Sequence, residues 1–134
     1  MSTYGKFRTD PEREKAGIWV QYGPAGKFLL ARAGGSNKEY AVRLEQLTRQ
    51  HLKSIQHGML DPVLADEILR QVYAEKVIRD WEGVTDEDGN LLPFSVANCV
   101  KLLKDLPELF RLIVEDAQGF ELYRTGLLEE AVKN

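Results

Sequence analysis

An acidic, glycine-containing stretch from Trp81 to Ser95 separates two segments of helical periodicity and constrains the fold more than any other feature. Pro93 near its end lacks the backbone N–H that a helix interior needs, and it biases the preceding residue toward extended backbone. Ser95 is a preferred helix N-cap, because its side chain accepts from free N–H groups of the first turn. The stretch therefore predicts a short turn or hairpin over residues 82–94, with a helix on either side.

The acidic tip of this stretch invites comparison with calcium loops. Asp86, Asp88 and Asn90 alternate as oxygen ligands do in such loops. An EF-hand loop also needs glycine at its sixth position and glutamate at its twelfth, and counted from Asp86 these places hold Leu91 and Ala97. The pattern fails, so the sequence predicts no metal site here.

A structural interpretation explains the same residues. The sequence Asp88-Gly89-Asn90 supplies side chains that tolerate a positive φ, so we expect a tight turn with short extended pieces on either side. We expect Trp81 and Phe94 to pack over the junction between the two helices. On this interpretation Trp81→Ala chiefly destabilises the fold.

Upstream, the pattern predicts a β-hairpin followed by an amphipathic helix. Residues 18–33 hold two apolar runs joined by a loop that contains Gly23 and Pro24. An isolated hairpin is only marginally stable, so it should pack on the helices. Residues 34–37 form a loop that ends in a cap for a helix over about 38–52, whose apolar face is Tyr40, Leu44, Leu47 and His51.

Downstream of a connection at 54–60, capping signals divide the chain into further helices. Asp61-Pro62 places a cap and a proline at a helix start, and the helix should run to about Trp81 as the central one of the fold. A short helix over 96–103 follows Ser95. Asp105-Leu106-Pro107 repeats the start signal for a last helix over 107–118, which resumes toward Tyr123.

Length and charge bound the class of protein. A chain of 134 residues fits one domain, with 1–16 as a solvated arm and 17–134 as the domain, made of the hairpin and a helical body over 38–125. The fold class expected is α+β, mainly α-helical, with about four helices. No apolar run approaches the roughly 20 residues of a membrane helix, and the N-terminus lacks a secretory pattern, so we expect a cytoplasmic protein.

The net charge of −3 conceals two halves of opposite sign. Residues 1–60 carry ten Lys and Arg against five Asp and Glu, whereas residues 61–134 carry eight against sixteen. Such polarity suits a protein partner or self-association. The basic residues are scattered rather than clustered with aromatic ones, so nucleic acid is not predicted as a partner.

Three side chains have reactive or metal-binding chemistry, one cysteine and two histidines. The single cysteine, Cys99, needs a paired base to act as a nucleophile, and no motif places His51 or His57 beside it. Two histidines without a pattern of cysteine or carboxylate partners do not make a zinc site. The sequence therefore predicts no catalytic residue, no cofactor and no metal.

Several segments together resemble the tail assembly chaperones of long-tailed bacteriophages over about residues 15–125. The run from Tyr73 to Leu109 carries the strongest likeness, together with residues 17–20, the strand at 28–33 with its following glycines, and Asn37. Ala97 departs from the family pattern, in which an acidic residue is expected at this position beside Asn98. The motif residues, which we interpret as structural, are Trp81, Gly83, Val84, Asp88, Gly89, Pro93, Phe94, Ser95, Asn98, Leu106, Pro107 and Phe110.

The resemblance implies a non-enzymatic protein of the host cytoplasm that keeps the tape measure protein soluble, helps to recruit tail tube protein subunits, and is absent from the mature virion. It also implies a longer product made by ribosomal slippage, because Lys133-Asn134 is what a slippery run of A would encode. The alternatives are a tail or head-completion protein retained in the virion and a small regulatory protein that contacts the host.

Overall fold

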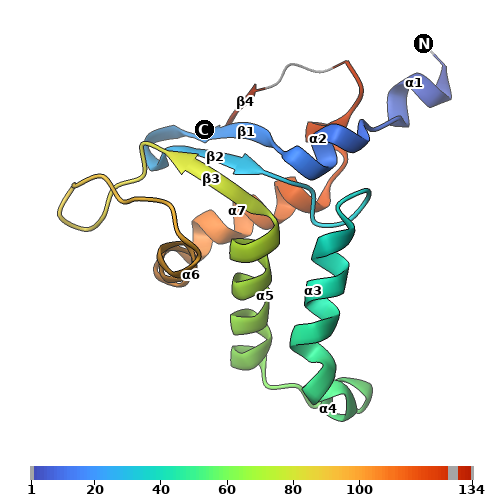
Figure 1. The fold of residues 1–134 in the computed structure, drawn as a ribbon, viewed down its shortest axis with the longest axis vertical. Helices are drawn as coiled ribbons and strands as arrows, with labels where there is room; N and C mark the ends of the chain where they lie inside the picture. The colour runs from blue at the N-terminus through green and yellow to red at the C-terminus, as the bar shows by residue number, and fades with distance from the viewer. Residues whose placement is uncertain (1, 127–129, 134) are drawn as a thin grey trace.

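The structure, a computed structural model, describes residues 2–126 and the backbone of 130–133, and it contains a four-stranded sheet in the order β3-β2-β1-β4. Strands β1 (Ile18–Tyr22) and β2 (Lys27–Leu30) form an antiparallel hairpin. Strand β3 (Ile78–Glu82) pairs antiparallel with β2, and β4 (Glu130–Lys133) pairs parallel with β1. Figure 1 shows the sheet at one end of the molecule, with a pair of helices projecting away from it.

The predicted hairpin is confirmed, and the alternation of buried and half-buried side chains along its strands explains how it packs. Val20 and Phe28 are opposite each other in the register and fully buried, as the inward face of a half-buried strand requires. A 3₁₀ turn over Gly23–Ala25 joins the strands. The second strand ends at Leu30 rather than Ala33, because the chain beyond it turns away after the Ala31 N–H donates to the Val77 carbonyl at 2.8 Å.

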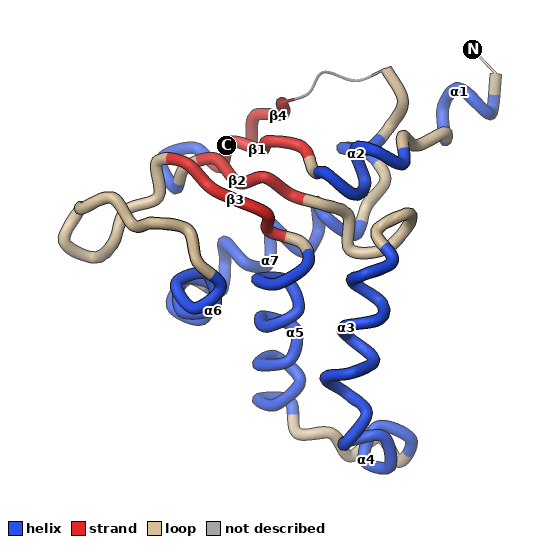
Figure 2. The backbone as a smooth tube through the Cα atoms, in the orientation of Figure 1, coloured by secondary structure: helices blue, strands red, loops and turns tan. Residues whose placement is uncertain are grey.

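Two antiparallel helices form the projecting arm of the molecule. α3 (Lys38–Thr48) continues through a 3₁₀ turn (Arg49–His51) into the short α4 (Leu52–Gln56), and α5 (Pro62–Lys76) returns to the sheet. The Asp61 carboxylate accepts from the Val63 N–H at 2.9 Å, which is the predicted cap. Figure 2 shows α3 and α5 side by side, with α4 and the loop after it at the far end.

The prediction that the central helix runs to Trp81 is wrong. α5 ends at Lys76, and the residues after it form β3 on the open edge of β2. The β-branched pair Val77 and Ile78 explains the change, because such side chains favour extended backbone and both are buried here. The helical spacing of apolar residues continued into this segment and concealed the strand.

The remaining helices are α6 (Val96–Asp105) and α7 (Pro107–Gln118), followed by a 3₁₀ turn over Glu121–Tyr123. Ser95 caps α6 as predicted, since its hydroxyl accepts from the Asn98 N–H at 3.0 Å. The predicted cap by Asp105 is wrong. That residue is still the last of α6, and its carboxylate lies 2.7 Å from the ammonium of Lys101 one turn earlier.

The core lies where the sheet meets α5, α6 and α7. Its largest fully buried side chains are Tyr73, Tyr123, Phe28, Leu30, Ile78, Leu103 and Ile113. The Tyr73 ring makes edge-to-face contacts with Tyr40 and Phe110, at centroid distances of 5.8 and 5.4 Å, so α3, α5 and α7 meet around it. The mainly helical α+β class, with the N-terminal hairpin packed on a helical body, is confirmed.

The N-terminal segment is more structured than a solvated arm. α1 (Thr3–Phe7) is exposed, but α2 (Pro11–Ala16) lies against the body. The Asp10 N–H donates to the Tyr123 carbonyl at 2.8 Å, and Glu14 is 2% exposed. The sequence of α2 is almost entirely charged and gives no sign of burial, because the residues that contact it, such as Arg32 and Tyr123, come from the loop after β2 and from the 3₁₀ turn over Glu121–Tyr123. The predicted domain extends to residue 134, and its residues 127–129 and 134 lie outside the described range.

Candidate functional site

The aromatic residues of the motif close the junction between the sheet and α6. Trp81 is 6% exposed, and its indole N–H donates to the Leu92 carbonyl at 2.8 Å. The rings of Phe28 and Phe94 meet it edge to face at centroid distances of 5.8 and 5.1 Å. At 6% exposed, the indole offers too little surface for stacking a ligand.

The acidic turn uses its polar groups internally. The Asp86 carboxylate accepts from the N–H groups of Asp88 and Asn90 at 2.9 and 3.0 Å. Gly89 has a φ of +82°, which a residue with a side chain adopts only at a cost. An isolated bridge between Thr85 and Leu91 closes the turn. Among residues 2–126, no group of three or more His, Cys, Asp and Glu side chains is placed to hold a metal.

The rest of the motif fixes the start of α6. Val84 is buried, and Gly83 before it has a φ of +73° that turns the chain out of β3. The Pro93 carbonyl accepts from the Asn98 amide at 2.9 Å, in addition to the cap by Ser95. These contacts lie within one short segment, so they hold the loop against α6.

The last three motif residues belong to the start of α7. Leu106 is the N-cap residue and is 44% exposed, Pro107 is the first residue of the helix, and Phe110 packs on the Tyr73 ring. Of the twelve motif residues, Leu106 is therefore the large apolar side chain that contacts solvent most. It marks one end of a groove.

That groove lies between the acidic turn and α6 and encloses about 490 Å³. We call it the acidic groove; it is lined by Thr85, Asp86, Glu87, Asp88, Leu92, Asn98, Lys101, Leu102, Asp105 and Leu106. The Lys101 ammonium is hydrogen-bonded to Asp105 and near Glu87, and these carboxylates raise the pKa of that lysine. Leu92 and Leu102 are half-buried and continue into the core.

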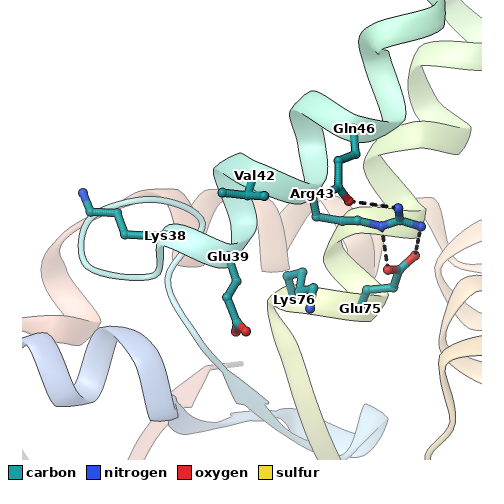
Figure 3. A pocket seen from close by; sticks show the side chains of 7 residues that line it. All are labelled: Lys38, Glu39, Val42, Arg43, Gln46, Glu75 and Lys76. Atoms are coloured by element: carbon teal, nitrogen blue, oxygen red, sulfur yellow. Dashed lines mark hydrogen bonds and ion pairs between the residues drawn. The ribbon is translucent and has the colours of Figure 1, made fainter.

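A second hollow, of about 500 Å³, lies between α3 and α5 near the sheet (Figure 3). The Arg43 guanidinium donates through two nitrogens to the Glu75 carboxylate, at 2.8 and 3.2 Å, and Gln71 donates to the same group at 2.6 Å. The hydrogen bond from Arg43 is the main reason why the pKa of Glu75 is lowered. Arg43 lies on α3 and Glu75 on α5, so their ion pair joins the two helices. We call it the Arg43–Glu75 clamp.

The far end of the projecting arm has a different character. Four large apolar side chains within a dozen residues are exposed there: Leu52, Ile55, Met59 and Val63, with Met59 76% exposed. We call this set the apolar tip. Between residues 46 and 60 the chain also carries two cations, two histidines and no carboxylate. The sequence shows both features in the segment that was predicted to be a helix end and connection.

The candidate reactive groups do not meet. Cys99 is buried in α6, and burial raises its pKa to about 12, which leaves it a neutral thiol. His51 and His57 are the residues that flank α4, and Figure 2 shows α4 at the far end of the arm. An activated cysteine needs a base within hydrogen-bond reach, and these histidines lie on another part of the molecule.

A partly buried ion pair has no local signal in the sequence. The Glu14 carboxylate lies 2.7 Å from a guanidinium nitrogen of Arg32. Burial alone would raise the pKa of Glu14, but hydrogen bonds from Arg32 and Ser36 and the arginine charge outweigh it, so the pKa is lowered. A Cβ at Gly35, where φ is +54°, would overlap the Glu14 carboxylate. The loop glycine is therefore part of this site.

Asn37 extends the network around this pair. Its amide donates to the carbonyls of Arg32 and Lys76, at 2.8 and 2.9 Å, so it joins the end of β2 to the end of α5. The sequence predicts a capping role for this residue, yet its side chain makes no cap hydrogen bond at the start of α3. Glu14 and Asn37 are the buried polar residues of the described core, and both roles are structural.

Comparison with known proteins adds the origin of the chain. No helix in the described part of the chain is both long and apolar enough to span a bilayer. No curated protein and no solved structure matches the sequence. A family model described as YdaY prophage protein matches residues 35–134, which include α3, α5, α6, α7 and the whole motif. The chain therefore belongs to the YdaY prophage protein family and is of phage origin.

Proposed function

We propose that the chain is a tail assembly chaperone that binds the tape measure protein and keeps it soluble until the tail tube forms around it. The prophage family supports a role in the phage life cycle. The motif from Tyr73 to Leu109 and the segments upstream of it support the finer assignment by resemblance. In this role the protein acts in the host cytoplasm, helps to bring tail tube subunits to the complex, and leaves before the virion matures.

The observation that carries the proposal is the apolar tip on its projecting helical arm. Large apolar side chains gathered on a surface mark sites of protein contact, and an elongated helical client exposes apolar seams of its own. An arm that extends away from the sheet, as Figure 1 shows, presents such side chains without steric hindrance from the body. Contact through a few side chains also stays weak enough for tube subunits to displace.

Covering a surface requires no catalysis, so we propose that the protein is not an enzyme. Its one thiol is buried with a raised pKa, and in the ionic hollow between α3 and α5 Arg43 and Glu75 are paired with each other. The groups that the chain offers to partners are instead apolar and charged surfaces. Self-association through these surfaces is compatible with this role.

Co-expression with the tape measure protein from the same prophage tests the proposal. The wild-type chain should raise the soluble yield of the tape measure protein, and the double variant Leu52→Ser/Met59→Ser should not. The matched control is Phe7→Ser/Leu112→Ser, which removes two exposed apolar side chains elsewhere. If the tape measure protein is equally soluble with and without the chain, the chaperone proposal is wrong.

The alternative of a protein retained in the virion predicts a different distribution. Mass spectrometry of purified particles should find no stoichiometric amount of the chain if it acts only during assembly. Abundant copies in mature particles would replace the chaperone with a structural tail or head-completion protein. A regulatory protein would be absent from particles as well, and would leave the solubility of the tape measure protein unchanged.

A further inference from the structure

The acidic groove combines an apolar floor with a negative rim, and the internal contacts of the motif account for only part of that rim. Leu92 and Leu102 form the floor, and Leu106 stands at one end, 44% exposed. A volume of about 490 Å³ lies within the range of preformed binding sites. Hydrogen bonds from Trp81 to the Leu92 carbonyl and from Asn98 to the Pro93 carbonyl hold the loop side of the groove in place.

The charges around this floor are unbalanced. Four carboxylates line the groove against one ammonium, which leaves three negative charges. Asp86 is engaged by its own turn and Asp105 by Lys101, whereas Glu87 and Asp88 are exposed side chains of the turn. Such a surface repels phosphate groups, so it disfavours nucleic acids and anionic lipid and favours a cationic ligand.

The shape of the floor selects among cationic ligands. Leu102 and Leu106 are four residues apart at the end of α6, so they present a short apolar row of the kind that packs against a second helix. A small cation would gain nothing from such a row. A helix with leucine-like side chains on one face and Lys or Arg beside them satisfies both the floor and the rim.

We propose that the acidic groove binds a basic amphipathic helix of a partner protein. The apolar side chains of that helix lie on Leu92, Leu102 and Leu106, and its cations face Glu87 and Asp88. In Figure 1 the loop before α6 and the far end of α3 lie on different parts of the molecule, so this surface is separate from the apolar tip. The inference therefore does not depend on the chaperone proposal.

Two synthetic peptides of about 18 residues test it, long enough for measurable helicity. Both carry the same leucine face, and the flanking positions hold lysine in one peptide and glutamate in the other. Fluorescence anisotropy with the purified chain should show the lysine peptide binding about tenfold more tightly at low salt, with the difference shrinking as ionic strength rises. Equal binding of the two peptides would overturn the proposal.

Variants locate the site. Glu87→Gln/Asp88→Asn should weaken binding of the lysine peptide about fivefold, because two rim charges are removed. The control Glu12→Gln/Glu45→Gln removes two exposed carboxylates from other helices, with side chains 82% and 74% exposed, and should leave binding unchanged. Equal weakening by both pairs would show a general charge effect and contradict the groove.

Leu106→Ser tests the apolar end of the groove without touching the charges, and should weaken binding of the lysine peptide about threefold. Thermal unfolding of the variant checks that it remains folded at the temperature of the binding measurement. Analytical ultracentrifugation of the chain alone tests the alternative that a second copy of the chain occupies the groove. If the chain self-associates, and the Glu87→Gln/Asp88→Asn variant abolishes that association, then a second copy fills the groove and the partner assigned here is wrong. The tip variant Leu52→Ser/Met59→Ser should bind the lysine peptide normally, so this test is independent of the co-expression test.

Discussion

The sequence of the junction around Trp81 suggests a functional site, but its residues serve the fold. The sequence of the apolar tip suggests a simple connection, but its side chains are exposed. The junction has conspicuous residues, an indole, an acidic turn, glycines and a proline, and nearly all of them contact each other. The tip lies in a plain connecting segment, yet its large side chains contact solvent. Side chains that contact each other inside the fold are unavailable to partners, so the side chains that stay exposed, at the junction as well as at the tip, are the better guide to function.

The difference follows from what each region must satisfy. The chain leaves β3, turns and enters α6 within a short span, so each polar group near the core needs a partner from that same span. The indole N–H and the Asn98 amide find theirs in the carbonyls of Leu92 and Pro93. At the tip, α3 and α5 are already joined by the Arg43–Glu75 clamp nearer the sheet, so packing demands less of the loop.

Replacing the indole should have the largest effect on stability. We expect Trp81→Ala to lower the free energy of unfolding by about 3–5 kcal/mol, because it leaves a large cavity and an unpaired Leu92 carbonyl. Chemical denaturation of the wild-type and variant chains measures the difference. The exposed Leu91→Ala in the same loop is the control and should change stability by no more than about 0.5 kcal/mol. If Trp81→Ala left stability unchanged but abolished binding of the tape measure protein, then Trp81 would be a binding residue and the junction, not the tip, would contact the partner.

Glu14 gives the next largest effect and a pH dependence. Glu14→Gln should cost about 2 kcal/mol, because the Arg32 guanidinium keeps its partial burial and loses its charged partner. The pKa of Glu14 is lowered in the folded state, so its contribution is present above the unfolded value near 4.3 and disappears as pH falls through the folded pKa.

The measurement is urea denaturation of both chains between about pH 7 and pH 3. The advantage of the wild-type chain should be constant at neutral pH and shrink as the pH falls below the unfolded pKa of glutamate. Glu12→Gln, on the exposed side of the same helix, should show no such convergence. A difference that stays constant down to the acid end would mean that Glu14 contributes through packing rather than charge.

Local signals in the sequence predict those parts of the fold whose partners are near in the chain. The hairpin and the helix starts at Asp61 and Ser95 depend on contacts within a few residues, and all three are present. Strand β3 was missed because its pairing with β2 is non-local, and helical spacing in the preceding residues extends into it. The burial of Glu14 depends on Arg32, eighteen residues away, which no local pattern reveals.

The candidate surfaces were harder to predict than the fold. The sequence identifies the acidic turn, but the groove exists only because α6 folds back beside it and contributes Leu102 and Leu106. The apolar tip requires knowing that Met59 and Val63 find no packing partner in the body. Whether a side chain is exposed depends on how distant segments pack against it. Periodicity within one helix assigns a residue to a face of that helix, but it does not show which segment covers that face.

Gly89 tests whether the turn is fixed by backbone conformation alone. A Cβ at this position meets no atom within 4 Å, so Gly89→Ala is free of steric clash but must adopt a φ near +82°. We expect a loss of about 1 kcal/mol in the free energy of unfolding. Gly119→Ala, at ordinary φ, is the matched control and should cost less. Equal losses would mean that the turn tolerates another conformation.

The smallest effect on stability is expected at the tip, where the contrast with Trp81 is sharpest. Leu52→Ser/Met59→Ser should change the free energy of unfolding by no more than about 0.5 kcal/mol, because both side chains are largely in water in the folded state. The same variant should lose the ability to keep the tape measure protein soluble. Thermal unfolding and co-expression measure the two properties on one protein. A marked loss of stability would show that the tip packs against the arm, and its exposure would then no longer indicate a partner.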